Sequence, residues 1–519
     1  MKFDSGAWRR ALAAALAVTL AVTPIVPTRL LAQNLPDLGD ESANALSPQM
    51  ERRIGDSYYR DLRRDPVYFD DPEVKAYIEE LGRLLIAAGP DPGMEIEFFA
   101  MRDSSINAFA MLGGYIGVNT GLLVAAQSES EAASVLAHEI GHLTQKHIAR
   151  SVSAGQRISV VSMIAMVVAL LAARSNSQVA SGAVAGAQAF QVQQQLAYSR
   201  DFEREADRVG FDILHKGEFD VSAMPAFFER LQRAGRAYES NAPIYVRSHP
   251  LTTERIADVR NRVQGVRHRS RADSLGFQLV RAKLRATQVA GVDGVRDAVT
   301  YFAGQLAGNT YSSLAATQYG YAEALLRARE FGAADAALAG LPRGVVHPMI
   351  DALAARIKLA AGDAAGAAAA YALAVKKHPQ ARYLQFALAD ALQVSGRHDE
   401  ALSLLREQAQ LYRTDARVYE LQAKSFAATG KAMSQHQALG EYYALIGSPQ
   451  AAIEQFQIAR CSRDGDFYQQ SIIDSRIRAL WDQVVAERVA RAETGQSAAG
   501  PGPPQRGPVP VQQAPTRCQ

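Results

Sequence analysis

The sequence predicts an α+β chain in which a mostly helical domain with a small β-sheet is followed by an all-α solenoid of repeats. Three observations lead to this fold class. An H-E-x-x-H motif lies within a helical pattern at 138–142, short apolar segments flank Gly113-Gly114, and glycines recur every 34 residues in the C-terminal half. A chain of 519 residues is also too long for one core, so more than one domain is expected.

The first 32 residues are typical of an export signal. Arginines at positions 9 and 10 precede an apolar run at 11–22, and Ala32 offers a small residue for cleavage. An uncleaved anchor is the alternative. Export implies an oxidising compartment, yet the chain has only Cys461 and Cys518, so the fold does not depend on a disulfide framework. The net charge of +3 does not indicate a nucleic-acid partner.

Helices are expected at 50–63 and 72–88, where apolar residues recur at helical spacing, and a strand is expected at 94–100. The residues on either side of Gly113-Gly114 then predict a β-hairpin. An edge strand can hold an extended peptide by backbone hydrogen bonds. The hairpin is therefore a candidate substrate strand, and a purely structural hairpin is the alternative.

His138, Glu139 and His142 form the H-E-x-x-H motif. Residues four apart share one helix face, so both imidazoles can hold one metal ion, while Glu139 deprotonates a water molecule beside it. Nitrogen ligands with an open position favour one Zn2+ per chain. Ser128 and a glutamate three residues later have the spacing of a capping box. His147 leaves the shared face and is interpreted as a bystander.

A third ligand is expected in YSRDFEREAD at 198–207, because catalytic zinc usually takes three protein ligands. Glu203 and Asp207 share a helix face, so one carboxylate can bind the metal while the other orients a histidine. Glu205 points roughly the opposite way. An ordinary charged helix is the alternative.

Residues 158–173 are almost wholly apolar but shorter than the roughly 20 residues of a spanning helix. A buried core helix, a helix that contacts the membrane surface and a mobile cover over the active site are the three interpretations. Cover or membrane contact is favoured, because the segment joins the two helices that carry the candidate ligands.

Gly362, Gly396 and Gly430 are each 34 residues apart and lie between helical patterns. This period is the signature of tetratricopeptide repeats, which stack on one another and offer a concave surface to partners. The repeats are expected to bury a core separate from that of the first domain, and to become irregular after about residue 446.

The expected divisions of the chain follow from these patterns. They are a signal peptide at 1–32, a catalytic domain at 33–270, a helical linker at 271–304, the repeats at 305–487 and a disordered tail at 488–519, which is rich in Pro, Gly and Gln.

HEIGH at 138–142, YSRDFEREAD at 198–207 and SHP at 248–250 together resemble the gluzincin-type metallopeptidases related to the CAAX prenyl protease and HtpX. With the export signal and the repeats, the chain is most similar to the periplasmic members of that group. The segment at 107–123 resembles their edge strand, although Leu112 stands where the family often has proline.

The resemblance implies His138, His142 and Glu203 as zinc ligands, Glu139 as the general base and Asp207 as a supporting acid.

It also implies that His249 approaches the metal and fills the fourth position in a closed state. A neutral imidazole there could instead stabilise an oxyanion, and a simple loop histidine is the third alternative. Arg255 could stabilise negative charge or form a salt bridge.

The sequence thus predicts a periplasmic zinc-dependent endopeptidase that cleaves misfolded or stalled envelope proteins. By resemblance, its repeats engage the outer-membrane protein assembly machinery. The alternative is a chaperone or scaffold that works mainly through the repeats, with rare and gated proteolysis.

Overall fold

The computed structural model describes residues 47–153, 200–237, 244–267 and 271–493. The expected signal peptide, the apolar segment at 158–173 and most of the expected tail lie outside these ranges, so those three predictions stay predictions. Within the described ranges, no helix combines the length and the apolar character that crossing a membrane requires.

Two capped helices precede the sheet, α3 (Pro48–Leu62) and α4 (Pro72–Ala88). The side-chain oxygens of Ser47 and Asp71 accept hydrogen bonds from backbone N–H groups in the first turn of α3 and α4, respectively. Each helix also has proline in its first turn. The predicted helices at 50–63 and 72–88 are therefore confirmed.

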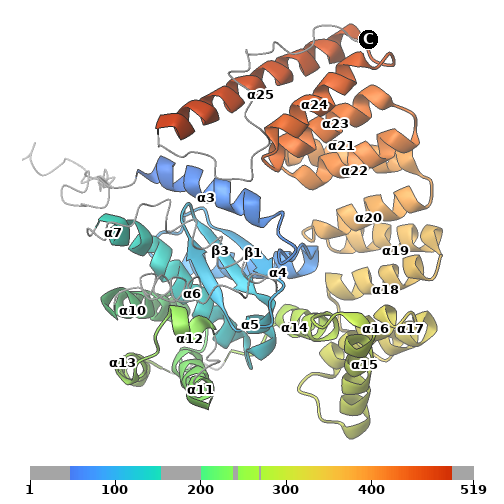
Figure 1. The fold of residues 1–519 in the computed structure, drawn as a ribbon. Helices are drawn as coiled ribbons and strands as arrows, with labels where there is room; N and C mark the ends of the chain where they lie inside the picture. The colour runs from blue at the N-terminus through green and yellow to red at the C-terminus, as the bar shows by residue number, and fades with distance from the viewer. Residues whose placement is uncertain (1–46, 154–199, 238–243, 268–270, 494–519) are drawn as a thin grey trace, which may run out of the picture.

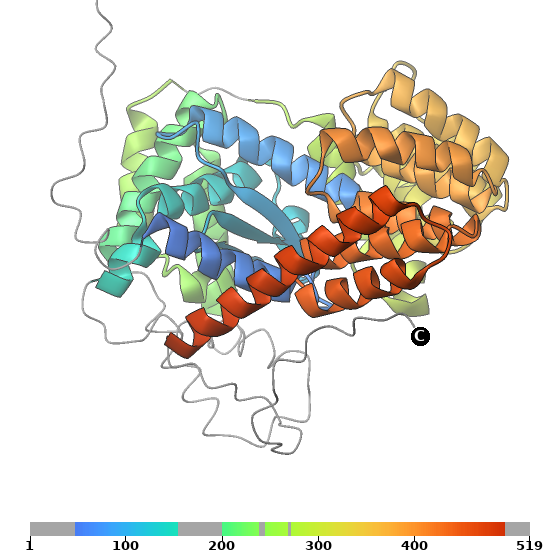
Figure 2. The ribbon, with the colours of Figure 1, turned by 90° about the horizontal axis from the view of Figure 1, so that it is seen from above.

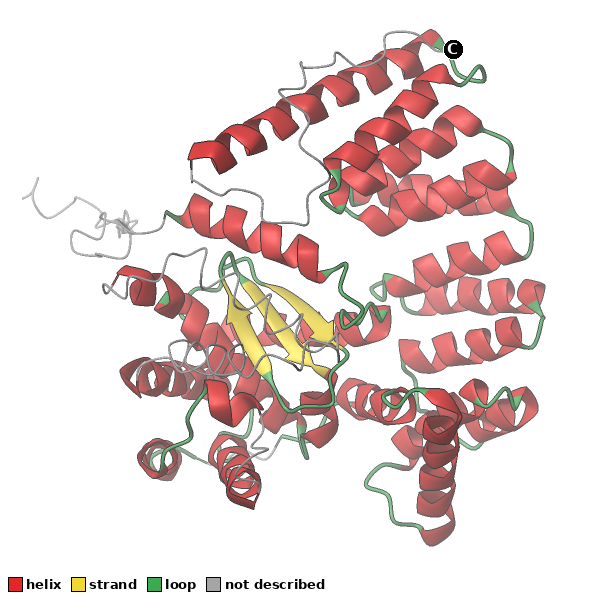
Figure 3. Cartoon of the chain, viewed as in Figure 1, coloured by secondary structure: helices red, strands yellow, loops and turns green. Residues whose placement is uncertain are grey.

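A small three-stranded sheet follows, with strand order β1-β3-β2 in the described chain. Its strands are β1 (Glu97–Met101), β2 (Ala108–Met111) and β3 (Tyr115–Asn119). β3 pairs parallel with β1 and antiparallel with β2, so β2 lies at an edge (Figure 3). The predicted hairpin is confirmed, and both of its turn glycines, Gly113 and Gly114, have positive φ.

The sheet leads into the helices that carry the predicted motifs. These are α5 (Thr120–Ala125), α6 (Glu129–Thr144), α7 (His147–Ser153), α10 (Arg200–Lys216), α11 (Ala223–Ala237), α12 (Ile244–Ser248) and α13 (Thr253–Gln264). Ser128 caps α6 by accepting a hydrogen bond from the Glu131 backbone N–H, as the capping box predicts. Figure 1 shows α6 between the sheet and α10.

The C-terminal half is a curved array of helix pairs. It comprises α14 (Leu275–Thr287), α15 (Gly291–Gly308), α16 (Leu314–Arg327), α17 (Phe331–Ala339), α18 (Pro348–Ala360), α19 (Ala364–Lys377), α20 (Tyr383–Val394), α21 (His398–Leu411), α22 (Ala416–Ala428), α23 (Ala432–Leu445), α24 (Pro449–Cys461) and α25 (Phe467–Glu493). The 34-residue glycines lie in the turns within three successive pairs, where φ is between 70° and 92°.

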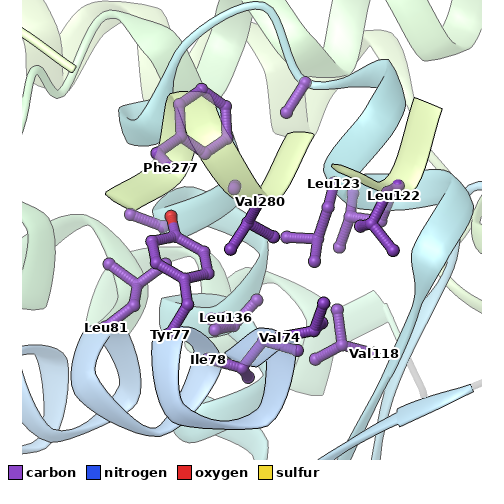
Figure 4. Close-up of a cluster of buried hydrophobic side chains, with 14 of the residues drawn as sticks. Val74, Tyr77, Ile78, Leu81, Val118, Leu122, Leu123, Leu136, Phe277 and Val280 are labelled. Carbon is purple, nitrogen blue, oxygen red and sulfur yellow. The ribbon is translucent and has the colours of Figure 1, made fainter. Parts of the chain in front are cut away.

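The first repeats share a core with the N-terminal half, so the expectation of separate cores is wrong for them, whereas the later repeats bury clusters of their own. One cluster of buried side chains runs from α4 and the sheet through α14 into the first repeats, and it includes Phe277, Tyr319 and Leu353. Figure 4 shows Phe277 and Val280 of α14 against Tyr77 and its neighbours on α4. The first helix of the expected linker, α14, is thus part of the core of the N-terminal domain.

Polar contacts join the halves at two places. Buried Lys283 of α14 forms ion pairs of 2.6 and 2.7 Å with Asp71 and Glu73 at the start of α4. Farther along the array, Arg64 donates to the Gly447 carbonyl and to the Ser448 hydroxyl before α24. Figures 1 and 2 show the array along one side of the N-terminal domain.

Candidate metal centre

Two glycines let α6 and α10 approach closely enough to bring their motifs together. A Cβ at Gly141 would lie 3.0 Å from the Ala206 carbonyl oxygen, and one at Gly210 would lie 3.1 Å from the backbone nitrogen of His138. A larger residue at either position would push the helices apart. This contact sets Glu203 of α10 opposite the histidines of α6.

Four side chains converge on one buried point, namely His138, His142, Glu203 and His249. Their ligand atoms all lie within 4.8 Å of one another, and all four residues are buried. The Nε2 atoms of His138 and His142 are 3.0 Å apart, and the Glu203 carboxylate lies 3.5 Å from each. The structure thus brings together the four residues that the sequence analysis assigned to one site.

His249 lies inside this cluster rather than beside it. Its Nδ1 is 3.1 Å from Glu203 Oε1 and 3.4 Å from His138 Nε2, while its Nε2 is 3.5 Å from Glu139 Oε1. The imidazole stacks on Tyr245, with ring centroids 4.8 Å apart. The histidine thus separates Glu139 from the other donors.

Glu139 is linked to the edge strand. Its Oε2 accepts a hydrogen bond of 3.0 Å from the Ala110 backbone N–H of β2. Its Oε1 is buried and has no hydrogen-bond partner among the described residues. Burial raises the pKa of Glu139, against the opposing effect of His249 and His138.

Asp207 and Arg255 support the cluster from behind. Asp207 Oδ1 lies 3.0 Å from His138 Nδ1, and Arg255 donates two hydrogen bonds of 2.7 and 2.8 Å to the Asp207 carboxylate. Arg255 Nη1 also lies 2.7 Å from Glu203 Oε2. The sequence left open whether Arg255 stabilises negative charge or forms a salt bridge, and in the structure it forms salt bridges.

The buried groups of the cluster shift one another's pKa values. Burial and the neighbouring His138 hold the pKa of His142 well below its usual range. Against burial, His249, His138 and Arg255 keep the pKa of Glu203 low. The pKa of His138 rises to about 9, because its hydrogen bonds to Asp207 and Glu203 outweigh burial. The anionic surroundings thus attract a positive charge to the position between the donors.

This donor set fits a metal ion. Two imidazole nitrogens and one carboxylate oxygen are the ligands of many catalytic zinc sites. Glu139 Oε1, buried without a partner among the described residues, points to a missing polar neighbour in the same cavity. His138, His142 and Glu203 are therefore the residues that would hold the ion.

Sequence reasoning missed two residues at this centre. His147, interpreted as a bystander, is buried, and its Nδ1 lies 2.8 Å from Nδ1 of His142. Helical spacing could not reveal this contact, because α6 ends at Thr144 and a new helix begins at His147. Tyr245 is also fully buried against His249, and no motif marks it.

Comparisons with known proteins agree with this geometry. Residues 70–263 match peptidase family M48, and residues 358–425 match a tetratricopeptide repeat family. The chain is 30% identical over 489 residues to the beta-barrel assembly-enhancing protease of Escherichia coli, covering 91% of this chain and 96% of that protein.

Two further relatives cover less of the chain. A Vibrio cholerae protein given the same protease name is 38% identical over 322 residues, which are 61% of this chain and 66% of that protein. The mitochondrial metalloendopeptidase OMA1 of Schizosaccharomyces pombe is 24% identical over 222 residues, which are 42% of this chain and 62% of that protein.

Proposed function

Because this chain belongs to the beta-barrel assembly-enhancing proteases of peptidase family M48, we propose that it is a zinc endopeptidase of the periplasm. Its substrates would be misfolded or stalled envelope proteins, in quality control of outer-membrane protein assembly. The observation that carries the proposal is the convergence of His138, His142 and Glu203 beside Glu139. One zinc ion per chain is proposed.

Zinc held by these residues would supply Lewis-acid chemistry, polarising a peptide carbonyl and making water more acidic. Glu139 takes the proton of the attacking water and then gives it to the leaving amine. Asp207 holds the His138 ring, and Arg255 holds Asp207. The raised pKa of Glu139 makes its carboxylate a stronger base toward the attacking water.

The edge strand supplies a place for the substrate backbone. The Asn107 carbonyl accepts a hydrogen bond from the Asn119 N–H of β3, whereas Ala110 donates away from β3 to Glu139. Alternate residues of a strand direct their backbone groups to opposite edges, so Ala108 and Ala110 face the free side. An extended peptide paired there would pass directly beside the general base.

His249 would act as a gate. Its ring occupies the space between Glu139 and the ligands, where an attacking water must lie. Substrate cleavage then requires His249 to withdraw. In an envelope compartment crowded with intact proteins, such a closed resting state would limit unwanted cleavage.

The repeats would recruit the protein partners. Tetratricopeptide arrays bind proteins on their concave surface, and the proposed partners here are substrate proteins and the outer-membrane protein assembly machinery. Residues 158–173 stay a candidate for a cover or for membrane-surface contact. A chaperone or scaffold that works through the repeats is the second candidate, and the closed position of His249 favours rare proteolysis.

Glu139→Gln tests the proposal. The variant should bind zinc and partner proteins as the wild type does but lose cleavage of an unfolded protein such as casein. Arg208→Gln, on the exposed face of α10, is the matched control and should keep most activity. If Glu139→Gln fully restores envelope function in cells that lack the protein, the chaperone candidate holds instead.

A further inference from the structure

Each of the two motif histidines has its second ring nitrogen engaged. His138 directs Nε2 into the cluster while its Nδ1 faces Asp207 Oδ1 at 3.0 Å. His142 also directs Nε2 into the cluster, and its Nδ1 lies 2.8 Å from Nδ1 of His147. The sequence predicted the first of these supports but not the second.

Hydrogen-bond chemistry fixes the roles in the second contact. If His142 offers the lone pair of Nε2 to a metal, its proton must be on Nδ1, which then donates. His147 Nδ1 must accept, so the proton of the neutral His147 ring is on Nε2. That nitrogen lies 3.2 Å from Glu205 Oε2, a suitable acceptor for it.

Glu205, at the far end of this series of hydrogen bonds, is itself held in place. Arg150, one turn along α7 from His147, donates a hydrogen bond of 2.9 Å to the same Glu205 oxygen. The His147 ring is fully buried and stacks on Phe202, with ring centroids 4.5 Å apart and planes 11° apart. His147 therefore has little freedom to turn away from His142.

We propose that His147 is a positioning residue that, with Glu205, fixes the ring orientation and the tautomer of His142 for metal binding. Glu205 and Glu203 lie on the same helix, so the chain His142–His147–Glu205 ties one ligand-bearing helix to the other from outside the centre. The inference rests on the proposed function, because it assigns His142 as a ligand. Loss of such supporting contacts typically weakens metal affinity 10–100-fold.

A pair of variants separates the hydrogen bond from packing. His147→Asn keeps an acceptor where Nδ1 lies, whereas His147→Leu fills the space without one. Zinc affinity of each full-length protein is measured by competition with a chromogenic chelator, and thermal unfolding of the metal-free proteins reports folding. His147→Leu should bind zinc 10–100-fold more weakly, and His147→Asn should stay within a few-fold of wild type.

A double-variant cycle tests the outer link. Glu205→Ala should weaken zinc binding modestly in the wild-type background and cause no further loss in His147→Leu, because the link is already broken. Arg208→Ala, an exposed change on the same helix, should change nothing.

The proposal is overturned if His147→Leu and His147→Asn bind zinc equally well, or if Leu binds more tightly. If His147→Leu fails to fold, His147→Asn and Glu205→Ala still test the proposal. Full additivity of their effects on zinc affinity would contradict a single series of hydrogen bonds. A wild-type protein that binds no zinc would instead defeat the proposed function, which keeps the two failures distinct.

Discussion

At the scale of single residues, the ligand assignment is open to direct test. His138→Ala, His142→Ala and Glu203→Ala should each lose most of the zinc, because two remaining protein ligands hold the ion poorly. Metal content is measured on purified full-length protein. Arg208→Ala is the control, since its side chain is exposed on α10, and it should retain close to one zinc per chain. Unchanged metal in His142→Ala would refute the assignment.

His249 gives a prediction whose sign identifies its role. If His249 is a gate that fills the space between Glu139 and the ligands, the His249→Ala variant should keep its zinc and cleave unfolded protein faster than wild type. As an oxyanion donor, the same variant should keep zinc and lose roughly a hundredfold in rate. Initial rates on casein with matched zinc content decide. Equal rates would reduce His249 to a buried loop histidine.

Residue spacing predicted the two pairs of neighbours on α6 and α10, whereas the choice of Glu203 as a ligand and the place of His249 came from the family resemblance. Spacing of four put His138 with His142 and Glu203 with Asp207 on helix faces, and the structure brings both pairs together. Tyr245 and His147 were beyond reach, because their contacts depend on how short helices end and turn. Helical periodicity does not predict a contact between residues of two different helices.

At the scale of elements, the positive φ of the repeat glycines predicts how their replacement changes the free energy of unfolding. Gly396 has φ of 76°, and no other described atom lies within 4 Å of a Cβ placed there. Gly396→Ala should therefore destabilise by roughly 1–2 kcal/mol through backbone strain alone. Gly304→Ala, inside α15 and equally uncrowded, should stabilise by roughly 0.5–1 kcal/mol. Urea unfolding compares them, and equal effects would contradict the argument.

The start of α18 predicts a pH dependence. His347 caps this helix by accepting from the Met349 N–H. Burial and the nearby charge of His378, against Glu73 and Asp351, lower the pKa of His347 from 6.5 to about 4. The unfolded chain then binds the extra proton, so this residue costs stability as pH falls from 6.5 to 4.

His347→Asn keeps the cap without a titrating ring. The free energy of unfolding of this variant should therefore fall less than that of wild type between pH 7 and 4.5. The difference between the two falls should be at most about 3 kcal/mol, because the site is partly open to water. Urea unfolding at both pH values measures the difference. Parallel losses in the two proteins would show that His347 does not titrate as proposed.

Most elements could be predicted because their signals are local. Ser47 and Asp71 with following prolines start α3 and α4, and the 34-residue glycines mark turns. The role of α14 could not be predicted. Its apolar face resembles that of any repeat helix, and only tertiary packing shows that Phe277 lies against the first domain.

At the scale of the whole molecule, the shared core reverses an expectation from sequence. With separate cores, a fragment ending at 304 would fold and bind zinc. Because Tyr319 and Leu353 belong to the same buried cluster as α4, this fragment should instead aggregate or unfold at lower temperature. A fragment ending at 411 retains that cluster and should stay monomeric and zinc-loaded. Size-exclusion chromatography and thermal unfolding compare them.

A wild-type melting temperature for the shorter fragment would show that the shared cluster contributes little.

The two attachments of the array, at Lys283 and at Arg64, hold it at a fixed position relative to the edge strand β2. A partner docked on the repeats can then deliver only those parts of its chain that reach β2 from a fixed starting point. Where a polypeptide is cut would depend on the length of unfolded chain between docking site and scissile bond, more than on the residues around that bond. An enzyme built in this way would select substrates by the length of chain that remains unfolded.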